Sequence, residues 1–172
     1  MTTSIQTPTL GVDIGRVLIG PVLDGQADTS FLGGTFERAM ETPPSPGAFD
    51  AMASLVEAFV GRVYLVSKCG SSVQDKTWHW LRHQGFWEAT GMKPKNVRFC
   101  LRRPEKAGIC AELGITHFVD DRVDIIASLD GVVATRILFG EQDTCVQVPR
   151  GAHVALNWAE VIPMLLPLRA AV

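Results

Sequence analysis

The hydrophobic positions of the chain alternate between short, nearly continuous apolar runs and longer segments with helical spacing. Apolar runs of this kind are typical of strands buried on both faces of a sheet, and they lie at residues 9–13, 62–67, 96–101, 116–120 and 132–139. Helical spacing occupies residues 47–59, 72–86, 104–113, 123–129 and 157–166. This alternation predicts an α/β fold: a three-layer, Rossmann-like parallel sheet of about five strands with helices on both faces.

Residues 20–46 interrupt this alternation. The segment is rich in glycine, proline and threonine and has weak periodicity, so we expect a loop or flap with a small hairpin near residues 31–34. Pro43, Pro44 and Pro46 end any regular element there. Residues 1–8 are polar, and we expect them to be disordered. We see no internal repeat or composition change, so residues 1–172 are predicted to form a single domain.

Composition excludes several classes of protein. Hydrophobic residues make up 47% and charged residues 20% of the chain, which is ordinary for a globular protein. The formal net charge of −2 gives no overall attraction to nucleic acid or to a membrane surface. No apolar run approaches the roughly 18 residues that span a bilayer, and the N-terminus lacks the features of a signal peptide. We therefore expect a cytoplasmic protein, with its four cysteines mostly buried as reduced thiols.

Polar side chains with potential for chemistry follow the apolar runs. Asp13, Ser67 and the pair Asp120 and Asp121 stand where three of the predicted strands end, and Lys106 lies in the helix that precedes the fourth strand. Ligands of parallel sheets bind beyond the carboxyl ends of the strands. Adjacent carboxylates repel one another, so a hard cation such as Mg²⁺ is their natural partner. With a lysine also present, such a site can hold a phosphate dianion.

The order and spacing of these residues resemble the haloacid-dehalogenase-like (HAD) superfamily over nearly the whole chain. Its four motifs match residues 12–17 (VDIGRV), the strand 63–67 ending in serine, Lys106, and residues 118–121 (FVDD). The segment at residues 43–47 (PPSPG) also resembles 5′-nucleotidase-like members. The resemblance implies a HAD-like fold and, in an active member, a phosphohydrolase that acts on a phosphate monoester.

The resemblance also implies a role for each residue in phosphoryl transfer. Asp13 would be the nucleophile and would form an aspartyl-phosphate. Ser67 would hydrogen-bond a phosphate oxygen, and Lys106 would neutralise both the nucleophile and the phosphoryl group.

A Mg²⁺ cofactor is implied by the same resemblance. Its ligands would be the carboxylates of Asp13 and Asp121 and the main-chain carbonyl of Gly15. Asp120 would support the metal from behind these ligands.

Two positions depart from the family pattern. Gly15 stands where phosphatases of the family carry a second aspartate, which protonates the leaving group and then activates water. General acid–base catalysis typically contributes about 10²–10⁴-fold. Three interpretations stay open: a slow or substrate-assisted phosphohydrolase, another HAD chemistry (a dehalogenase is disfavoured because it needs no metal), or a non-catalytic module that binds a phosphorylated ligand or a protein. Arg16 replaces the usual small residue; it could pair with an acid or a substrate anion, but we expect it to project into solvent.

Members of this superfamily usually cover the site with a cap domain, inserted after the first or the second motif. The chain is predicted to have no such domain, or a minimal one. Residues 20–46 leave room only for a flap, and residues 70–104 are used by one helix and one strand. An open site suits a macromolecular substrate or closure by another subunit, which would exclude water. We therefore expect a homo-oligomer or a macromolecular partner that covers the strand ends.

Other candidate residues are more simply explained by packing or exposure. His79 and His83 are spaced as metal ligands on a helix can be, but we expect a packed or surface pair. Trp78 and Trp80 are two residues apart, so one helix face cannot bury both, and one is expected to be exposed. The basic residues around the third strand could steer a phosphorylated ligand, though a solvated loop is nearly as good an explanation. These residues are Lys95, Arg98, Arg102, Arg103 and Lys106.

Overall fold

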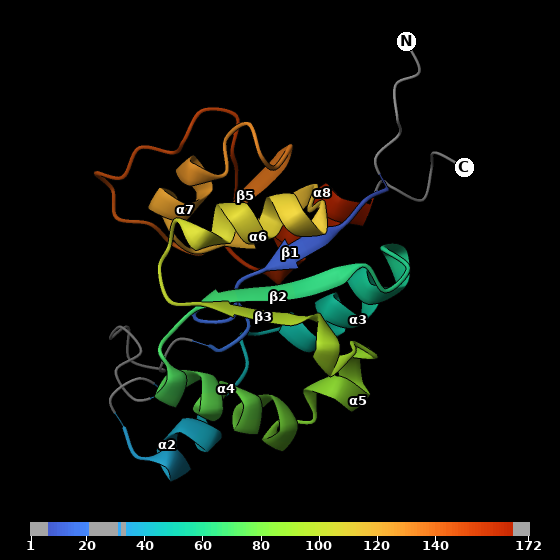
Figure 1. Ribbon diagram of the computed structural model, residues 1–172, viewed down its shortest axis with the longest axis vertical. Coiled ribbons are helices and arrows are strands. Elements are labelled where there is room, and N and C mark those ends of the chain that lie inside the picture. The colour runs from blue at the N-terminus through green and yellow to red at the C-terminus, as the bar shows by residue number, and fades with distance from the viewer. Residues whose placement is uncertain (1–6, 21–30, 32–33, 167–172) are drawn as a thin grey trace.

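A computed structural model describes residues 7–20, 31 and 34–166 and contains one six-stranded parallel sheet (Figure 1). The strands are β1 (Leu10–Val12), β2 (Val63–Lys68), β3 (Val97–Cys100), β4 (His117–Asp120), β5 (Thr135–Phe139) and β6 (His153–Ala155), in the spatial order β3-β2-β1-β4-β5-β6. From β1 the chain adds β2 and β3 on one side and then returns to add β4, β5 and β6 on the other, so the strand order switches between β1 and β4. Ligands bind at such a switch point in open α/β sheets, so the carboxyl ends of β1 and β4 are where a site is expected.

Helices cover both faces of this sheet. They are α2 (Phe36–Glu41), α3 (Ala48–Ala58), α4 (Ser71–His83), α5 (Phe86–Thr90), α6 (Glu105–Leu113), α7 (Val123–Ser128) and α8 (Trp158–Leu165), with a 3₁₀ turn, η1 (Pro94–Asn96). Figure 1 shows α6 and α7 on one face of the sheet and α3 and α5 on the other. The three-layer α/β architecture predicted from the sequence is confirmed. No described helix is long and apolar enough to cross a membrane.

The buried side chains form two apolar clusters, one on each face of the sheet. Strand β2 contributes to both: Val63 and Leu65 belong to the larger cluster, on the α3 face, while Val66 belongs to the smaller one with Phe118. Successive side chains of a strand point to opposite faces. A strand covered on both faces therefore has to be apolar at nearly every position, which is the pattern that made these strands visible in the sequence.

The structure differs from the sequence prediction at three places. Within residues 20–46, helix α2 replaces part of the expected loop: Thr35 caps its N-terminus by accepting a hydrogen bond from the Arg38 amide, and Ala39 and Met40 are buried. The helix expected at 72–86 is divided into α4 and α5, because Gly85 adopts a left-handed conformation with φ of 69°. Strand β6 was not predicted. Most of the hairpin expected near 31–34 lies outside the described residues.

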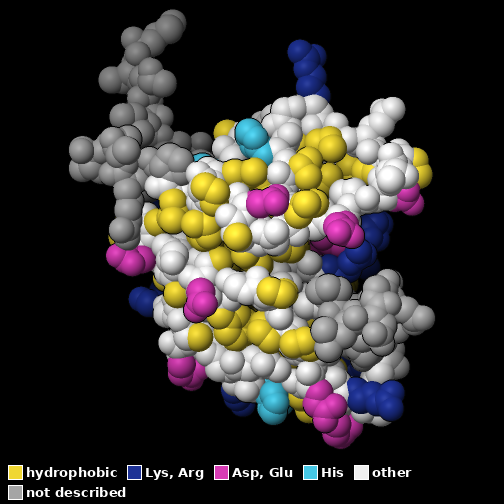
Figure 2. Space-filling view, turned by 180° about the vertical axis from the view of Figure 1, so that it is seen from behind, with side chains coloured by type: hydrophobic (Ala, Val, Ile, Leu, Met, Phe, Trp, Pro, Cys, Tyr) yellow, Lys and Arg dark blue, Asp and Glu magenta, His cyan; other side chains and the backbone are white. Residues whose placement is uncertain are grey.

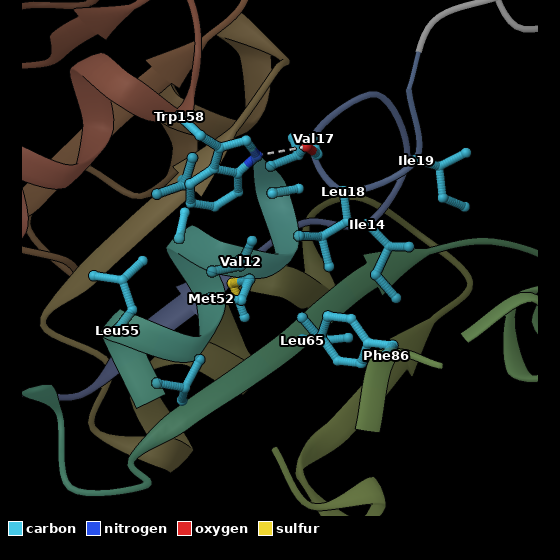
Figure 3. Packing of buried hydrophobic residues seen from close by; sticks show 14 of the residues in the cluster. Val12, Ile14, Val17, Leu18, Ile19, Met52, Leu55, Leu65, Phe86 and Trp158 are labelled. Carbon is cyan, nitrogen blue, oxygen red and sulfur yellow. Dashed lines mark hydrogen bonds between the residues drawn. The ribbon is translucent and has the colours of Figure 1, made fainter. Parts of the chain in front are cut away.

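The loop that follows β1 is anchored by its own apolar side chains. Ile14, Val17, Leu18 and Ile19 are all buried (Figure 3). Trp158, at the start of α8, donates a hydrogen bond from its indole nitrogen to the Val17 carbonyl at 3.0 Å. The backbone on which Asp13 is mounted is therefore held by the core on one side and by α8 on the other.

Basic side chains do not form a continuous surface on the face of the molecule seen in Figure 2. There, the described lysines and arginines lie at the margins, and apolar and acidic side chains occupy the centre. This face has no extended positive stripe of the kind that contacts many phosphates of a nucleic acid.

Candidate active site

A cavity of about 390 Å³ opens at the carboxyl ends of β1, β2 and β4. Five of the six residues that the sequence indicated line it. They are Asp13, Gly15, Ser67, Lys106 and Asp121. The sixth, Asp120, ends β4 and is completely buried. The strand ends thus bring together residues that are up to 108 positions apart in the sequence.

Asp13 and Lys106, which line the cavity, form an ion-paired triad with the buried Asp120 behind them, and this triad is called the floor. The ammonium nitrogen of Lys106 lies 2.7 Å from Oδ1 of Asp13 and 2.7 Å from Oδ2 of Asp120. Lys106 comes from the first turn of α6, and its side chain is only 2% exposed. A buried ammonium ion is strongly disfavoured unless carboxylates compensate it. The two aspartates supply that compensation and fix where the lysine points.

The ionisation of the triad follows from these contacts. Burial by itself would lower the pKa of Lys106, but the attraction and hydrogen bonds of Asp13 and Asp120 outweigh it, so this pKa is raised above its usual range. Burial raises the pKa of Asp120, and repulsion from Asp13 adds to the effect, while Lys106 opposes it. Lys106 is therefore a fixed positive charge at neutral pH.

Asp120 directs its carboxylate to the protein rather than to the cavity. Oδ2 accepts the hydrogen bond from Lys106, and Oδ1 accepts one from the backbone amide of Arg122 at 2.9 Å. Both oxygens thus have a partner. Asp120 holds Lys106 and the start of the turn after β4 in place, and the open carboxylate at this strand end is the next residue, Asp121.

Asp13, Asp120 and Asp121 offer carboxylate oxygens that all lie within 4.8 Å of one another. Asp121 carries less compensation than the other two: its carboxylate meets the Arg16 guanidinium at 3.4 Å. Burial, followed by repulsion from Asp13, raises the pKa of Asp121 to about 6. Hard oxygen donors in this arrangement fit the coordination preference of Mg²⁺, and a cation there would relieve their mutual repulsion.

The other wall of the cavity is formed largely by apolar groups. Phe31 and Ile19 line it together with Val73 of α4. Cys69 also lines the cavity, but burial raises the pKa of its thiol to about 11. A thiolate is the reactive form of cysteine, so the raised pKa disfavours Cys69 as a nucleophile, whereas the carboxylate of Asp13 opens onto the same cavity.

Arginines form the rim of the cavity. Arg16, Arg103 and Arg122 all line it. Arg103 and Arg122 approach the same carboxylate, Asp124, at 3.5 and 3.1 Å. Sequence reasoning singled out Arg103 only as part of a basic cluster and missed Arg122, whose one signal was its place directly after the acidic pair.

Arg16 is largely exposed, as expected, and it also contacts an acid, which was the alternative. Its guanidinium pairs with Asp121, although the side chain remains 55% exposed. Its backbone is left-handed, with φ of 60°. This conformation costs a residue other than glycine roughly 1–2 kcal/mol.

The remaining sequence candidates lie away from the cavity. His79 packs edge-on against Phe36, and His83 ends α4. Trp80 is buried and donates to the Thr42 carbonyl at 2.7 Å, whereas Trp78 is 37% exposed, as their spacing predicted.

The predicted basic cluster is dispersed in the structure. Arg102 pairs with Glu105 on the surface, and Arg98 lies over the Tyr64 ring and hydrogen-bonds the Lys95 carbonyl. Only Arg103 and Lys106 of this cluster line the cavity.

Comparison with known proteins gives a structural match without a sequence match. The sequence matches no protein-family profile and no curated protein. Among solved structures, the fold is similar to a crystal structure of a haloacid dehalogenase-like family hydrolase from Xanthomonas campestris, with a TM-score of 0.60 and 11% sequence identity. The match covers 96% of this chain and 97% of that one. This chain therefore has the haloacid-dehalogenase-like fold that its four motifs predicted.

Proposed function

We propose that this protein is a Mg²⁺-dependent phosphohydrolase that removes the phosphoryl group of a phosphate monoester through an aspartyl-phosphate on Asp13. The observation that carries the proposal is the Asp13 carboxylate, held 2.7 Å from a buried lysine at the floor of a cavity. The name of the structural neighbour, a hydrolase of the same fold, supports the same class of reaction.

Asp13 and Asp121 are the side chains that would hold the metal, together with the main-chain carbonyl of Gly15. The fit rests on the donor set: the carboxylates of Asp13 and Asp121 open onto the cavity and lie in a cluster with Asp120 whose oxygens are within 4.8 Å of one another. When bound, Mg²⁺ would offset the negative charge that otherwise keeps a phosphate dianion away from a carboxylate nucleophile.

The protein's own side chains then divide the work of the reaction. Asp13 attacks phosphorus, and its carboxylate becomes the acyl part of the aspartyl-phosphate. Lys106 stays protonated and stabilises the charge that builds up on the phosphoryl oxygens. Ser67, at the end of β2, donates its hydroxyl to one of these oxygens and orients the group.

A second function, binding of a phosphorylated ligand or a protein without turnover, is favoured by one observation. Gly15 places no side chain at the position of the family's acid–base aspartate. A Cβ at Gly15 would meet no atom of the described residues within 4 Å, so no described side chain takes the place of the missing aspartate there. The same floor and rim would bind phosphate in either case.

The proposal is tested by measuring Mg²⁺ binding by calorimetry and hydrolysis of an aryl phosphate by initial rates. We expect Mg²⁺-dependent hydrolysis in the natural protein and none in Asp13→Asn. Asp50→Asn, which changes an exposed aspartate of α3 outside the cavity, is the matched control and should behave as the natural protein. Phosphate and Mg²⁺ binding without any hydrolysis would support the binding module instead. Equal hydrolysis by Asp13→Asn would contradict both roles of Asp13.

A further inference from the structure

The described residues that line the cavity include no group suited to protonate a leaving group. The carboxyls among them are those of Asp13 and Asp121, which belong to the nucleophile and the metal site, and no histidine is present in this lining. Lys106 is engaged by two carboxylates. An alcohol leaving as an alkoxide needs a proton in the transition state, and an acid that supplies it contributes about 10²–10⁴-fold. Substrates whose leaving group needs no proton do not lose this rate enhancement when the acid is absent.

The cations of the same lining outnumber the carboxylates that pair with them. Its cations are Arg16, Lys68, Arg103, Lys106 and Arg122, and the carboxylates that pair with them are those of Asp13, Asp120, Asp121 and Asp124, which leaves one positive charge in excess. Arg103 and Arg122 share the single carboxylate of Asp124, so one guanidinium charge between them is not balanced by it. Arginine is suited to bidentate binding of carboxylate and phosphate. The rim is therefore built to hold an anion in addition to the phosphoryl group.

Arg16 connects this rim to the reacting atoms. It lies three residues after Asp13 and contacts Asp121 at 3.4 Å, a long ion pair that a ligand can replace. It also keeps a left-handed backbone in which glycine would be unstrained. Strain that persists next to a site points to a function of the residue that bears it.

We propose that the site acts on anhydrides of phosphoric acid, either acyl phosphates or diphosphates, and that Arg16 with Arg103 and Arg122 binds the anion that leaves. This inference rests on the proposed phosphohydrolase function and specifies its substrate class. The carboxylate or phosphate that departs is the anion for which the rim has surplus positive charge. Its release also removes the need for the acid that Gly15 does not provide.

The bonds and protons balance without any further reactant than water. An oxygen of Asp13 bonds to phosphorus, and the bond from phosphorus to the bridging oxygen breaks with its electron pair on the departing carboxylate or phosphate. Water then adds to phosphorus, and the bond to Asp13 breaks with its electron pair on the Asp13 carboxylate. The protons of that water remain on orthophosphate or pass to solvent.

The test compares kcat/KM for acetyl phosphate, pyrophosphate and glycerol phosphate in the full-length natural protein with Mg²⁺, and in the Arg16→Ala and Gly15→Asp variants. We expect the natural protein to prefer an anhydride over glycerol phosphate by about 10²–10⁴-fold. Gly15→Asp should gain that factor for glycerol phosphate and little for the anhydrides. Arg16→Ala should lose about tenfold or more for the anhydrides, since hydrogen bonds to charged groups are worth about 1.5–3 kcal/mol. Arg82→Ala, which removes an exposed arginine of α4, is the control.

Each outcome separates the inference from the function on which it rests. Preference for acetyl phosphate identifies a carboxylate as the departing anion, and preference for pyrophosphate identifies a phosphate. If glycerol phosphate reacts as fast as the anhydrides in the natural protein, or if Arg16→Ala changes neither anhydride, the inference is overturned while the phosphohydrolase stands. If none of the three substrates is hydrolysed, or if Asp13→Asn hydrolyses them equally well, the proposed phosphohydrolase function is wrong.

Discussion

The floor and the rim of the cavity are both built from charged residues, but they differ in burial and in how tightly those charges are paired. On the floor, Lys106 lies 2.7 Å from each of two buried aspartates. On the rim, Arg16, Arg103 and Arg122 are 44–55% exposed, and their ion pairs measure 3.1–3.5 Å. The floor has one fixed arrangement, suited to positioning a nucleophile. The rim can exchange its partners for those of a ligand.

This difference has an energetic side. Breaking one member of a buried ion pair leaves an uncompensated charge and is strongly destabilising. Exposed ion pairs are screened by water and contribute roughly 0–1 kcal/mol. Changes to the floor should therefore alter both folding and chemistry, whereas changes to the rim should alter substrate preference alone.

Removing the charge of Lys106 is expected to have the largest effect. Lys106→Met keeps most of the side-chain volume but leaves Asp13 and Asp120 facing each other without a cation. We expect the free energy of unfolding at pH 7 to fall by about 3–5 kcal/mol, measured by urea denaturation, with loss of turnover. Lys95→Met, at an exposed lysine of η1, is the control. A loss below about 1 kcal/mol would show that the triad is not the rigid element described above.

Asp121→Asn should sharpen the comparison, because it stabilises the protein while it damages the site. Folding raises the pKa of Asp121 to about 6. The protonated form thus gains stability that is fully present below the unfolded pKa of 3.8 and is lost as the pH rises through about 6. At pH 7 without metal, the variant should be more stable by up to about 3 kcal/mol, at roughly 1.4 kcal/mol per pKa unit.

Two measurements check this prediction. Thermal unfolding at pH 4 and pH 7 should show that the advantage of Asp121→Asn grows with pH, and calorimetry should show weakened Mg²⁺ binding. A variant that is less stable than the natural protein at pH 7 would mean that Arg16 compensates Asp121 more fully than its 3.4 Å separation indicates.

Trp158→Phe tests whether the anchored loop after β1 belongs functionally to the floor. The change keeps the aromatic packing and removes the hydrogen bond to the buried Val17 carbonyl. We expect a loss of about 1–2 kcal/mol in unfolding free energy and a lower kcat with a similar KM, because the loop that carries Asp13 is held less firmly. Urea denaturation and initial rates measure the two effects, and unchanged kcat would separate the loop anchor from catalysis.

The smallest effect on stability is expected at the rim. Arg103→Ala and Arg122→Ala each remove one exposed partner of Asp124 and should change the unfolding free energy by less than about 1 kcal/mol. Their consequence should instead appear as a higher KM for the anhydride substrate. A large loss of stability with unchanged KM would place these arginines in the structural part of the site.

The fold and the floor could be predicted from the sequence because both depend on strong local patterns. Buried parallel strands are apolar at nearly every position, and the polar residues at the ends of three of them, Asp13, Ser67 and Asp120, stand out. Lys106 was found through its place in the motif order. Its burial and its ion pairs with two aspartates depend on tertiary packing, which the local sequence pattern does not show.

The elements and residues that the sequence did not reveal are short, exposed or placed by contacts between distant parts of the chain. Strand β6 has only three residues, His153–Ala155, so its apolar run is too short to indicate a strand. Helix α2 has six residues, although Phe36, Ala39 and Met40 have the helical spacing that could have indicated it. Arg122 joins the rim only because Asp124 and Arg103 lie beside it in space.

The most direct test of the central claim is to trap the aspartyl-phosphate on Asp13. The protein is mixed with Mg²⁺ and acetyl phosphate, quenched rapidly in acid, and its intact mass and phosphorylated peptide are measured. We predict a mass increase of one phosphoryl group that requires Mg²⁺, maps to the peptide containing Asp13 and is absent in Asp13→Asn. Phosphorylation that maps to another residue, or that persists undiminished in Asp13→Asn, would contradict the account.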